Sequence, residues 1–200
     1  MKQEKKQKQG QPTKKNEVLS YSVEVRDKEG RVLRRISAPS KSYVQQWNQV
    51  INIQAKGTAS TLTVTDGSTA SIGIASNNLS LAAGIGAATY GIRVGKGTTA
   101  VAIDDFALET PLEQGAGLDQ FAHQAETFTV PAVVGPTCSF TTSRIMINNS
   151  GAIITGIREI GAYMIMEAKK GLGFRDVLPG AVTVPDGGSI TVTYTIAVTV

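Results

Sequence analysis

The sequence has 200 residues and a net charge of +4, and it is rich in glycine and in small or β-prone residues, which favours a mostly β protein over a helical bundle. Cys138 is the only cysteine, which excludes an intrachain disulfide and leaves a metal site built from His and Cys poorly supplied. No run reaches the roughly 18 apolar residues that span a bilayer, and no apolar segment follows the charged start. We therefore expect no membrane partner and no secretory signal.

The first segment, residues 1–17, is a basic, low-complexity arm. Residues 1–15 carry six lysines and one acid, whereas residues 16–200 are nearly neutral at −1. A Lys/Gln segment cannot bury enough apolar area to offset the entropy of ordering, so we predict a flexible arm. The arm either solubilises the chain or contacts nucleic acid or a neighbouring protein, and the lack of arginine favours protein over nucleic acid. The candidate contact residues are Lys2, Lys5, Lys6, Lys8, Lys14 and Lys15.

The second segment, residues 18–57, predicts a β-hairpin followed by an amphipathic helix. Two β-prone runs flank DKEG, in which Gly30 is placed for a turn. Ser37 or Ser40 is expected to cap the helix, and Pro39 suits its first turn.

The predicted helix has an apolar face and a clear end. Tyr43, Trp47, Val50 and Ile51 fall at helical spacing, and Gly57 follows as a stop signal. We expect Trp47 to anchor the helix on a sheet.

The third segment, residues 58–200, predicts a Gly-rich antiparallel β domain. Alternating runs flank the Asp66-Gly67 turn, and two further alternating strands flank PDGG near the C-terminus. The last strand is long and apolar on one face, so we expect its edges to be paired or covered, and the need for cover favours a homo-oligomer. Short strands at regular spacing with one early helix indicate an antiparallel β-sandwich or a barrel-like fold.

The stretch GKGTT at residues 95–99 has the composition of a phosphate-binding loop but not its pattern. The nucleotide-binding pattern requires a glycine where Tyr90 stands and a hydroxyl residue where Gly97 stands. The dinucleotide pattern fails as well, because Gly91 follows Gly86 by five positions instead of three. We therefore predict no nucleotide site and no cofactor.

Acidic residues gather immediately after this stretch, at Asp104, Asp105, Glu109 and Glu113. Paired carboxylates serve glycosidases and metal sites, but carboxylates in a loop are more often solvated or paired with nearby cations. A carbohydrate-active enzyme that uses Asp104, Asp105 or Glu109 is the least favoured function, and we expect a protein that is not an enzyme.

Three segments between residues 90 and 200 resemble bacteriophage tail-fibre and collar-type virion proteins. They are VGKGTTAVAIDDFALETPL (94–112), FTTSRIMINNSGAIITGIREIGAYM (140–164) and FRDVLPGAVTVPDGGSITVTYTI (174–196). The family patterns are G-x-G-T-x-A…D…L, then E-I-G-L-Y, then R-D-V-L followed by V-x-V-P-x-G, and Ala162 stands where leucine is usual. The resemblance implies a structural component of a virus particle, such as a tail, collar, fibre-base or adaptor protein, made in the host cytoplasm and located in the virion.

A protein of this kind is expected to assemble with itself, as a trimer or a ring, and with other virion proteins. Opposite charges beside apolar runs suit pairing between subunits, although they also occur at strand ends of monomers. The candidate interface residues are Tyr43, Trp47, Arg158, Glu159, Arg175 and Asp176. The alternative is a jelly-roll capsid or decoration protein whose basic arm binds nucleic acid.

Overall fold

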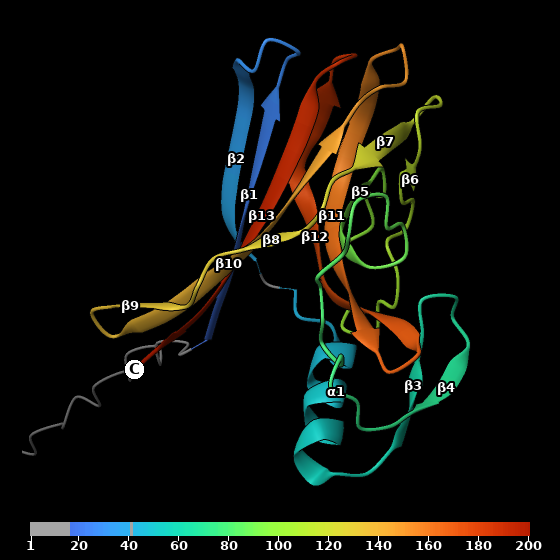
Figure 1. Ribbon diagram of the computed structural model, residues 1–200, viewed down its shortest axis with the longest axis vertical. Helices are drawn as coiled ribbons and strands as arrows, with labels where there is room; N and C mark the ends of the chain where they lie inside the picture. The colour runs from blue at the N-terminus through green and yellow to red at the C-terminus, as the bar shows by residue number, and fades with distance from the viewer. Residues whose placement is uncertain (1–16, 41) are drawn as a thin grey trace, which may run out of the picture.

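The computed structural model describes residues 17–40 and 42–200, which form a mostly β protein with one helix (Figure 1). Within that part of the chain, no helix is long and apolar enough to cross a membrane. In chain order, the elements are β1 (Glu17–Arg26), β2 (Val32–Ser40), α1 (Gln45–Lys56), β3 (Ser60–Thr63), β4 (Thr69–Ile72), β5 (Gly91–Gly95), β6 (Glu113–Gln114), β7 (Gln120–His123), β8 (Thr127–Phe128), β9 (Ala132–Val134), β10 (Thr137–Ile147), β11 (Ile154–Met166), β12 (Lys169–Val184) and β13 (Ser189–Thr199).

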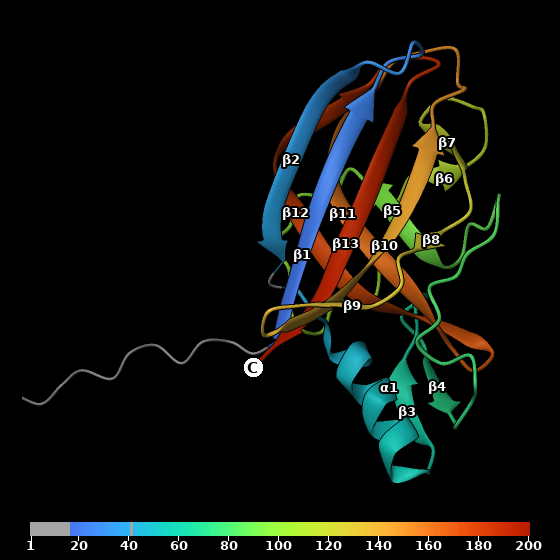
Figure 2. The same ribbon diagram turned by 60° about the vertical axis from the view of Figure 1, so that its left-hand side comes forward.

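The larger sheet, sheet A, has the strand order β2-β1-β13-β10-β7-β6, and β8 and β9 also pair with β10. Strand β13 lies between β1 and β10 and pairs antiparallel with both over nearly its whole length (Figure 2). The apolar C-terminal strand is therefore covered on both edges by its own chain. The expectation that this strand is paired or covered is confirmed, and the pairing is provided within the chain.

The smaller sheet, sheet B, has the order β12-β11-β5, and all of its pairs are antiparallel. It lies behind β1, β13 and β10 in Figure 2 and shares one hydrophobic core with sheet A. Strands β3 and β4 form a separate hairpin. The predicted turn at Asp66-Gly67 is confirmed, because Gly67 has a φ of 81°, which favours glycine.

Two turns carry the chain between the sheets. Both predicted strands beside PDGG are present, but β12 belongs to sheet B and β13 to sheet A, so this turn crosses between the sheets. The buried side chain of Asn148, in the NNSG turn, donates from Nδ2 to the carbonyl oxygens of Ala152 (2.8 Å), Val184 (3.0 Å) and Pro185 (3.1 Å). The two crossing turns are thereby joined by the amide of one residue.

The predicted end of the helix is confirmed and its predicted start is wrong. Gly57 ends α1 in the left-handed conformation, with a φ of 73°. The residues expected to cap the helix lie instead in β2, where Pro39 is opposite Ser20 of β1. Proline is tolerated there because β2 is an edge strand, and the helix begins only at Gln45, after Val44 at the N-cap.

Trp47 anchors the helix to sheet B, as predicted. Its ring centroid lies 5.1 Å from that of Phe174 on β12 and 5.4 Å from that of Tyr43. The predicted face was partly wrong, since Ile51 is exposed and Ile53 is buried in its place.

The first and last parts of the described chain share their core. Tyr21 of β1 and Tyr194 of β13 contact edge to face, with ring centroids 6.3 Å apart. Residues on both sides of position 57 belong to one buried cluster. The predicted boundary at residue 57 therefore divides segments that pack as a unit.

Candidate functional site

Strand β11 has two different faces because successive side chains of a strand point in opposite directions. Ile160 and Met164 belong to the core between the sheets, whereas Glu159 and Tyr163 contact the connection between β5 and β6. That connection, residues 96–112, packs on the outer face of sheet B. It contains all but the first two residues of the first of the three segments that resemble phage proteins.

The carboxylate of Glu159 is fully buried and accepts four hydrogen bonds. Backbone N–H groups of Gly97 (3.0 Å), Glu109 (3.0 Å) and Thr110 (2.7 Å) donate to it, and so does Nε of Arg175 (3.0 Å). Hydrogen bonds to an ionised acceptor are among the strongest in proteins. Glu159 therefore fastens the beginning and the end of residues 96–112 to β11.

The glycines that gave this segment the look of a phosphate loop surround the carboxylate of Glu159. A Cβ atom added to Gly97 would lie 2.5 Å from Cβ of Glu109 and 2.6 Å from Cδ of Glu159. A Cβ atom at Gly95 would collide with Glu159 as well. The backbone N–H groups do cradle an anion, but this anion belongs to the protein itself.

Arg175 connects Glu159 to two further carboxylates. Its Nη1 lies 2.9 Å from Oδ2 of Asp105, and its Nη2 lies 3.6 Å from Oε2 of Glu109. Burial opposes the charge of the guanidinium, but the hydrogen bonds to Asp105 and Glu159 outweigh that cost and raise the pKa of Arg175. One buried cation thus joins β12, β11 and the connection between β5 and β6.

Two acids considered for catalysis hold the backbone of the same connection. Asp105 accepts a hydrogen bond from the N–H group of Ala102 (3.0 Å). Glu109 accepts from the N–H groups of Thr98 and Thr99 (2.8 Å each), and the bond from Thr99 contributes most to lowering the pKa of Glu109. Both carboxylates are therefore engaged in hydrogen bonds that hold the backbone of the connection.

A pocket of about 500 Å³ opens beside the cluster. Its lining includes Asp104, Phe106 and Arg175. No group of three or more His, Cys, Asp and Glu side chains in the described part of the chain is arranged to hold a metal ion.

Tyr163 provides a further contact between β11 and the connection. Its hydroxyl oxygen accepts a hydrogen bond from the N–H group of Leu108 (2.6 Å), and the guanidinium of Arg93 lies over its ring, 5.7 Å from the centroid. Burial raises the pKa of the Tyr163 hydroxyl. The motif residues Glu159 and Tyr163 therefore contact the same segment at two points.

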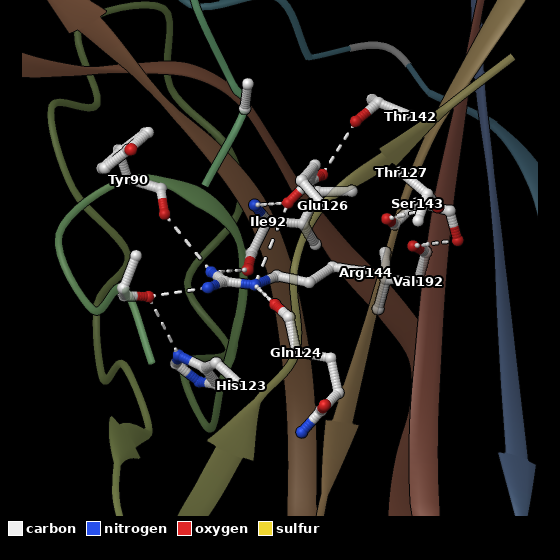
Figure 3. Close-up of polar contacts among 12 residues, drawn as sticks. Tyr90, Ile92, His123, Gln124, Glu126, Thr127, Thr142, Ser143, Arg144 and Val192 are labelled. Carbon is white, nitrogen blue, oxygen red and sulfur yellow. Dashed lines mark hydrogen bonds and ion pairs between the residues drawn. The ribbon is translucent and has the colours of Figure 1, made fainter. Parts of the chain in front are cut away.

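A second buried charge, Arg144 on β10, lies on the inner face of sheet A (Figure 3). Its guanidinium donates to five backbone carbonyl oxygens, those of Gln124 (2.8 Å), Tyr90 (3.2 Å), Ile92 (3.2 Å), Gly84 (3.3 Å) and Ala87 (2.7 Å). Burial lowers the pKa of Arg144. Three of these carbonyl groups, those of Gly84, Ala87 and Tyr90, belong to the irregular residues 84–90.

Glu126 lies beside Arg144 and supports the same region. It accepts hydrogen bonds from Oγ1 of Thr142 (2.8 Å) and from the N–H group of Ile92 (3.1 Å). Its Oε2 atom is 3.9 Å from Nε of Arg144, and neither side chain reaches the solvent. Burial raises the pKa of Glu126.

His123 completes this buried group (Figure 3). Its Nδ1 atom lies 3.4 Å from the carbonyl oxygen of Ala87, and Nε2 is buried without a hydrogen-bond partner among the described residues. Burial, and then the nearby charge of Arg144, lower the pKa of His123 to about 4. The imidazole is therefore neutral near pH 7.

The residues predicted at a subunit interface divide into two groups. The half-buried ones are Tyr43, Trp47 and Arg158. The buried ones are Glu159, Arg175 and Asp176. Oδ2 of Asp176 accepts hydrogen bonds from Ser40 (2.8 Å) and Tyr194 (3.1 Å). The structure thus places the second group inside one chain, which corrects the expectation that these three side chains face a neighbour.

The six lysines predicted to contact nucleic acid or a neighbouring protein, at positions 2, 5, 6, 8, 14 and 15, lie outside the described residues. Their role stays a prediction. Arg144 and Glu126 were not predicted from the sequence as functional residues. The available signal was a charge within the alternating strand TTSRIMI, but the apolar residues Ile145 and Ile147 suggest the opposite face as the buried one.

Comparison with known protein families, curated protein sequences and solved structures finds no match to this chain.

Proposed function

We propose that this protein is a non-enzymatic structural component of a virus particle, of the phage tail, collar, fibre-base or adaptor class. In this proposal it acts as a rigid β scaffold within a homo-oligomer. Sheets A and B would face each other as in an antiparallel sandwich. The protein would be made in the host cytoplasm and located in the virion.

One observation carries the proposal: the three segments that resemble phage structural proteins contact one another through their motif residues. Glu159 of REIGAY contacts Gly97 of VGKG, Arg175 of FRDVL contacts Asp105, and Tyr163 contacts Leu108. Motif residues that contact one another are expected where the motifs together hold one scaffold in shape.

The chemistry of these contacts supports a scaffold over a catalytic site. Buried backbone groups outside regular secondary structure need polar partners, and the buried charges supply them here. Glu159 accepts hydrogen bonds from three backbone N–H groups of its own chain, and Arg144 donates to five backbone carbonyl oxygens. Long connections held in this way give a protein a fixed surface for assembly.

Gold labelling of virus particles tests the proposal. An antibody against the purified protein is applied to particles from cultures that express the gene. We expect gold at one defined position on the particle. Particles that carry no label, while the protein remains in the cell lysate, would show that it is not a virion component.

A further inference from the structure

The pocket beside Glu159 and Arg175 contains a buried donor that the fold leaves without an acceptor. Arg175 lines this pocket, and its side chain is only 2% exposed. Nε and Nη1 donate to Glu159 and Asp105, but Nη2 donates no hydrogen bond to any described residue. Nη2 lies 3.6 Å from Oε2 of Glu109, which also lines the pocket. A buried donor without an acceptor is costly, so this position favours a ligand that supplies one.

Two carboxylates of the same pocket have unused acceptor oxygens. Asp105 accepts both of its hydrogen bonds, from Ala102 and Arg175, through Oδ2, and Oδ1 has no partner among the described residues. Asp104 is exposed, and its side chain forms no hydrogen bond or ion pair within the described part of the chain. The lining of the pocket therefore offers acceptors as well as a donor.

An aromatic ring lies beside these polar groups. Phe106 lines the pocket and is 39% exposed. The turn between β3 and β4 lies against one end of the ring, since a Cβ atom added to Gly67 would be 3.3 Å from Cζ of Phe106. The exposed remainder of the ring gives the pocket an apolar surface next to its hydrogen-bonding groups, which is the usual composition of a small-molecule site.

The charges of the lining restrict the class of ligand. Three carboxylates and one guanidinium line the pocket, which gives the lining a net charge of −2. An anion would be repelled by the carboxylates, and a cation would leave Nη2 of Arg175 without an acceptor. A hydroxyl group both donates and accepts, so a neutral ligand with several hydroxyl groups satisfies the carboxylates and Nη2 together. A saccharide also has apolar C–H groups on the faces of its ring, which suit packing against Phe106.

We infer that this pocket binds a neutral saccharide. Hydroxyl groups of the sugar donate to Asp104 and to Oδ1 of Asp105. Another hydroxyl group accepts from Nη2 of Arg175, and the sugar ring packs on Phe106. The pocket volume of about 500 Å³ lies within the range of small-molecule sites. We assign binding and no reaction, because Asp105 and Glu109 already hold the backbone of the connection.

Saturation-transfer difference NMR on the full chain tests the inference with three neutral probes, maltose, lactose and N,N′-diacetylchitobiose. At least one probe is expected to bind with a Kd of about 1 mM or below. Asp104→Ala is expected to weaken this binding by about tenfold, the cost of one hydrogen bond to a charged group. The variant should fold normally, because the Asp104 side chain has no partner within the described chain to lose. Phe106→Ala should weaken binding to a similar extent, because it removes the ring on which the sugar packs.

Ile103→Ala is the matched control, because Ile103 belongs to the same connection and is 68% exposed but does not line this pocket. Its Kd should equal that of the wild type. Failure of all three probes to bind at about 10 mM, or equal Kd values for Asp104→Ala and Ile103→Ala, overturns the inference. Binding of inorganic phosphate, or of a synthetic peptide of residues 1–16, in place of the saccharides also overturns it, since these probes would identify an anion site or a cation site. Gold labelling tests the proposed function without reference to this pocket, so the two can fail independently.

Discussion

Residues 84–90 and residues 96–112 are two irregular connections that pack on buried charges of opposite sign. The first turns backbone carbonyl groups inward, and Arg144 donates to them. The second turns N–H groups inward, and Glu159 accepts from them. An unpaired backbone group is costly to bury, so the sign of the buried charge follows from which backbone group faces it.

The two centres differ in how they are supported. The only carboxylate described beside Arg144 is Glu126, 3.9 Å away, and the direct partners of Arg144 are neutral carbonyl groups. Glu159 instead contacts the guanidinium of Arg175 directly, at 3.0 Å, and Arg175 also contacts Asp105. We therefore expect the loss of Arg144 to be the more damaging change.

The largest effect is expected for Arg144→Met. The substitution leaves five carbonyl groups without their donor and Glu126 buried without a cation, so the free energy of unfolding should fall by about 3–5 kcal/mol. Urea denaturation measures the change. Arg35→Met is the control, because that side chain is 68% exposed beside Glu24 and its loss should cost less than about 1 kcal/mol. Equal losses in the two variants would show that the stability of the fold does not depend on the hydrogen bonds from Arg144 to the five carbonyl groups.

The pH dependence of stability isolates His123. Its pKa is lowered to about 4 in the folded state, so between pH 6.5 and 4 the unfolded chain binds a proton that the folded chain does not. The contribution of the buried neutral imidazole to the free energy of unfolding is therefore fully present above pH 6.5. About 3 kcal/mol of it is lost as the pH falls to 4, at about 1.4 kcal/mol per pH unit. The raised pKa of Glu126 acts in the opposite direction, so the wild type must be compared with His123→Gln. Urea denaturation at several pH values should give a shallower dependence for His123→Gln, and parallel curves would refute the assignment.

Glu159→Gln is expected to cost about 2 kcal/mol, because the amide keeps one acceptor oxygen but turns an NH₂ group toward backbone donors. The substitution should also loosen residues 96–112, so limited proteolysis is expected to cut there faster than in the wild type. Glu113→Gln is the matched control, since Glu113 also bonds an arginine, Arg93, but is 57% exposed. Equal proteolysis of the two variants would contradict the role of Glu159 in holding the connection.

The smallest effect is expected for Asp105→Asn. Arg175 keeps its contact with Glu159 in this variant, so the free energy of unfolding should fall by only about 1 kcal/mol. Thermal unfolding measures the shift. A loss as large as that of Glu159→Gln would mean that the outer carboxylate matters as much as the buried one.

Features that depend on a few neighbouring residues could be predicted from the sequence. The hairpin turn at Gly30 and the helix end at Gly57 are confirmed, and both glycines have a positive φ. Trp47 was placed correctly between helix and sheet because aromatic side chains at helical spacing have few other ways to be buried. The sequence does not predict that the backbone at residues 95–99 binds Glu159, which becomes visible only in the structure.

The tertiary structure decided which strand faces are buried and which strands pair. Alternation in β10 distinguishes two faces, but only packing on sheet B shows that Arg144 and Met146 point inward while Ile145 is exposed. Likewise, the sequence indicates strands on both sides of PDGG but not that they belong to different sheets. Local spacing determines periodicity and turns, whereas the choice of face and partner depends on contacts between residues far apart in the chain. The guanidinium of Arg144 can be buried because connections remote in sequence supply carbonyl oxygens in place of the water molecules that would otherwise hydrate it.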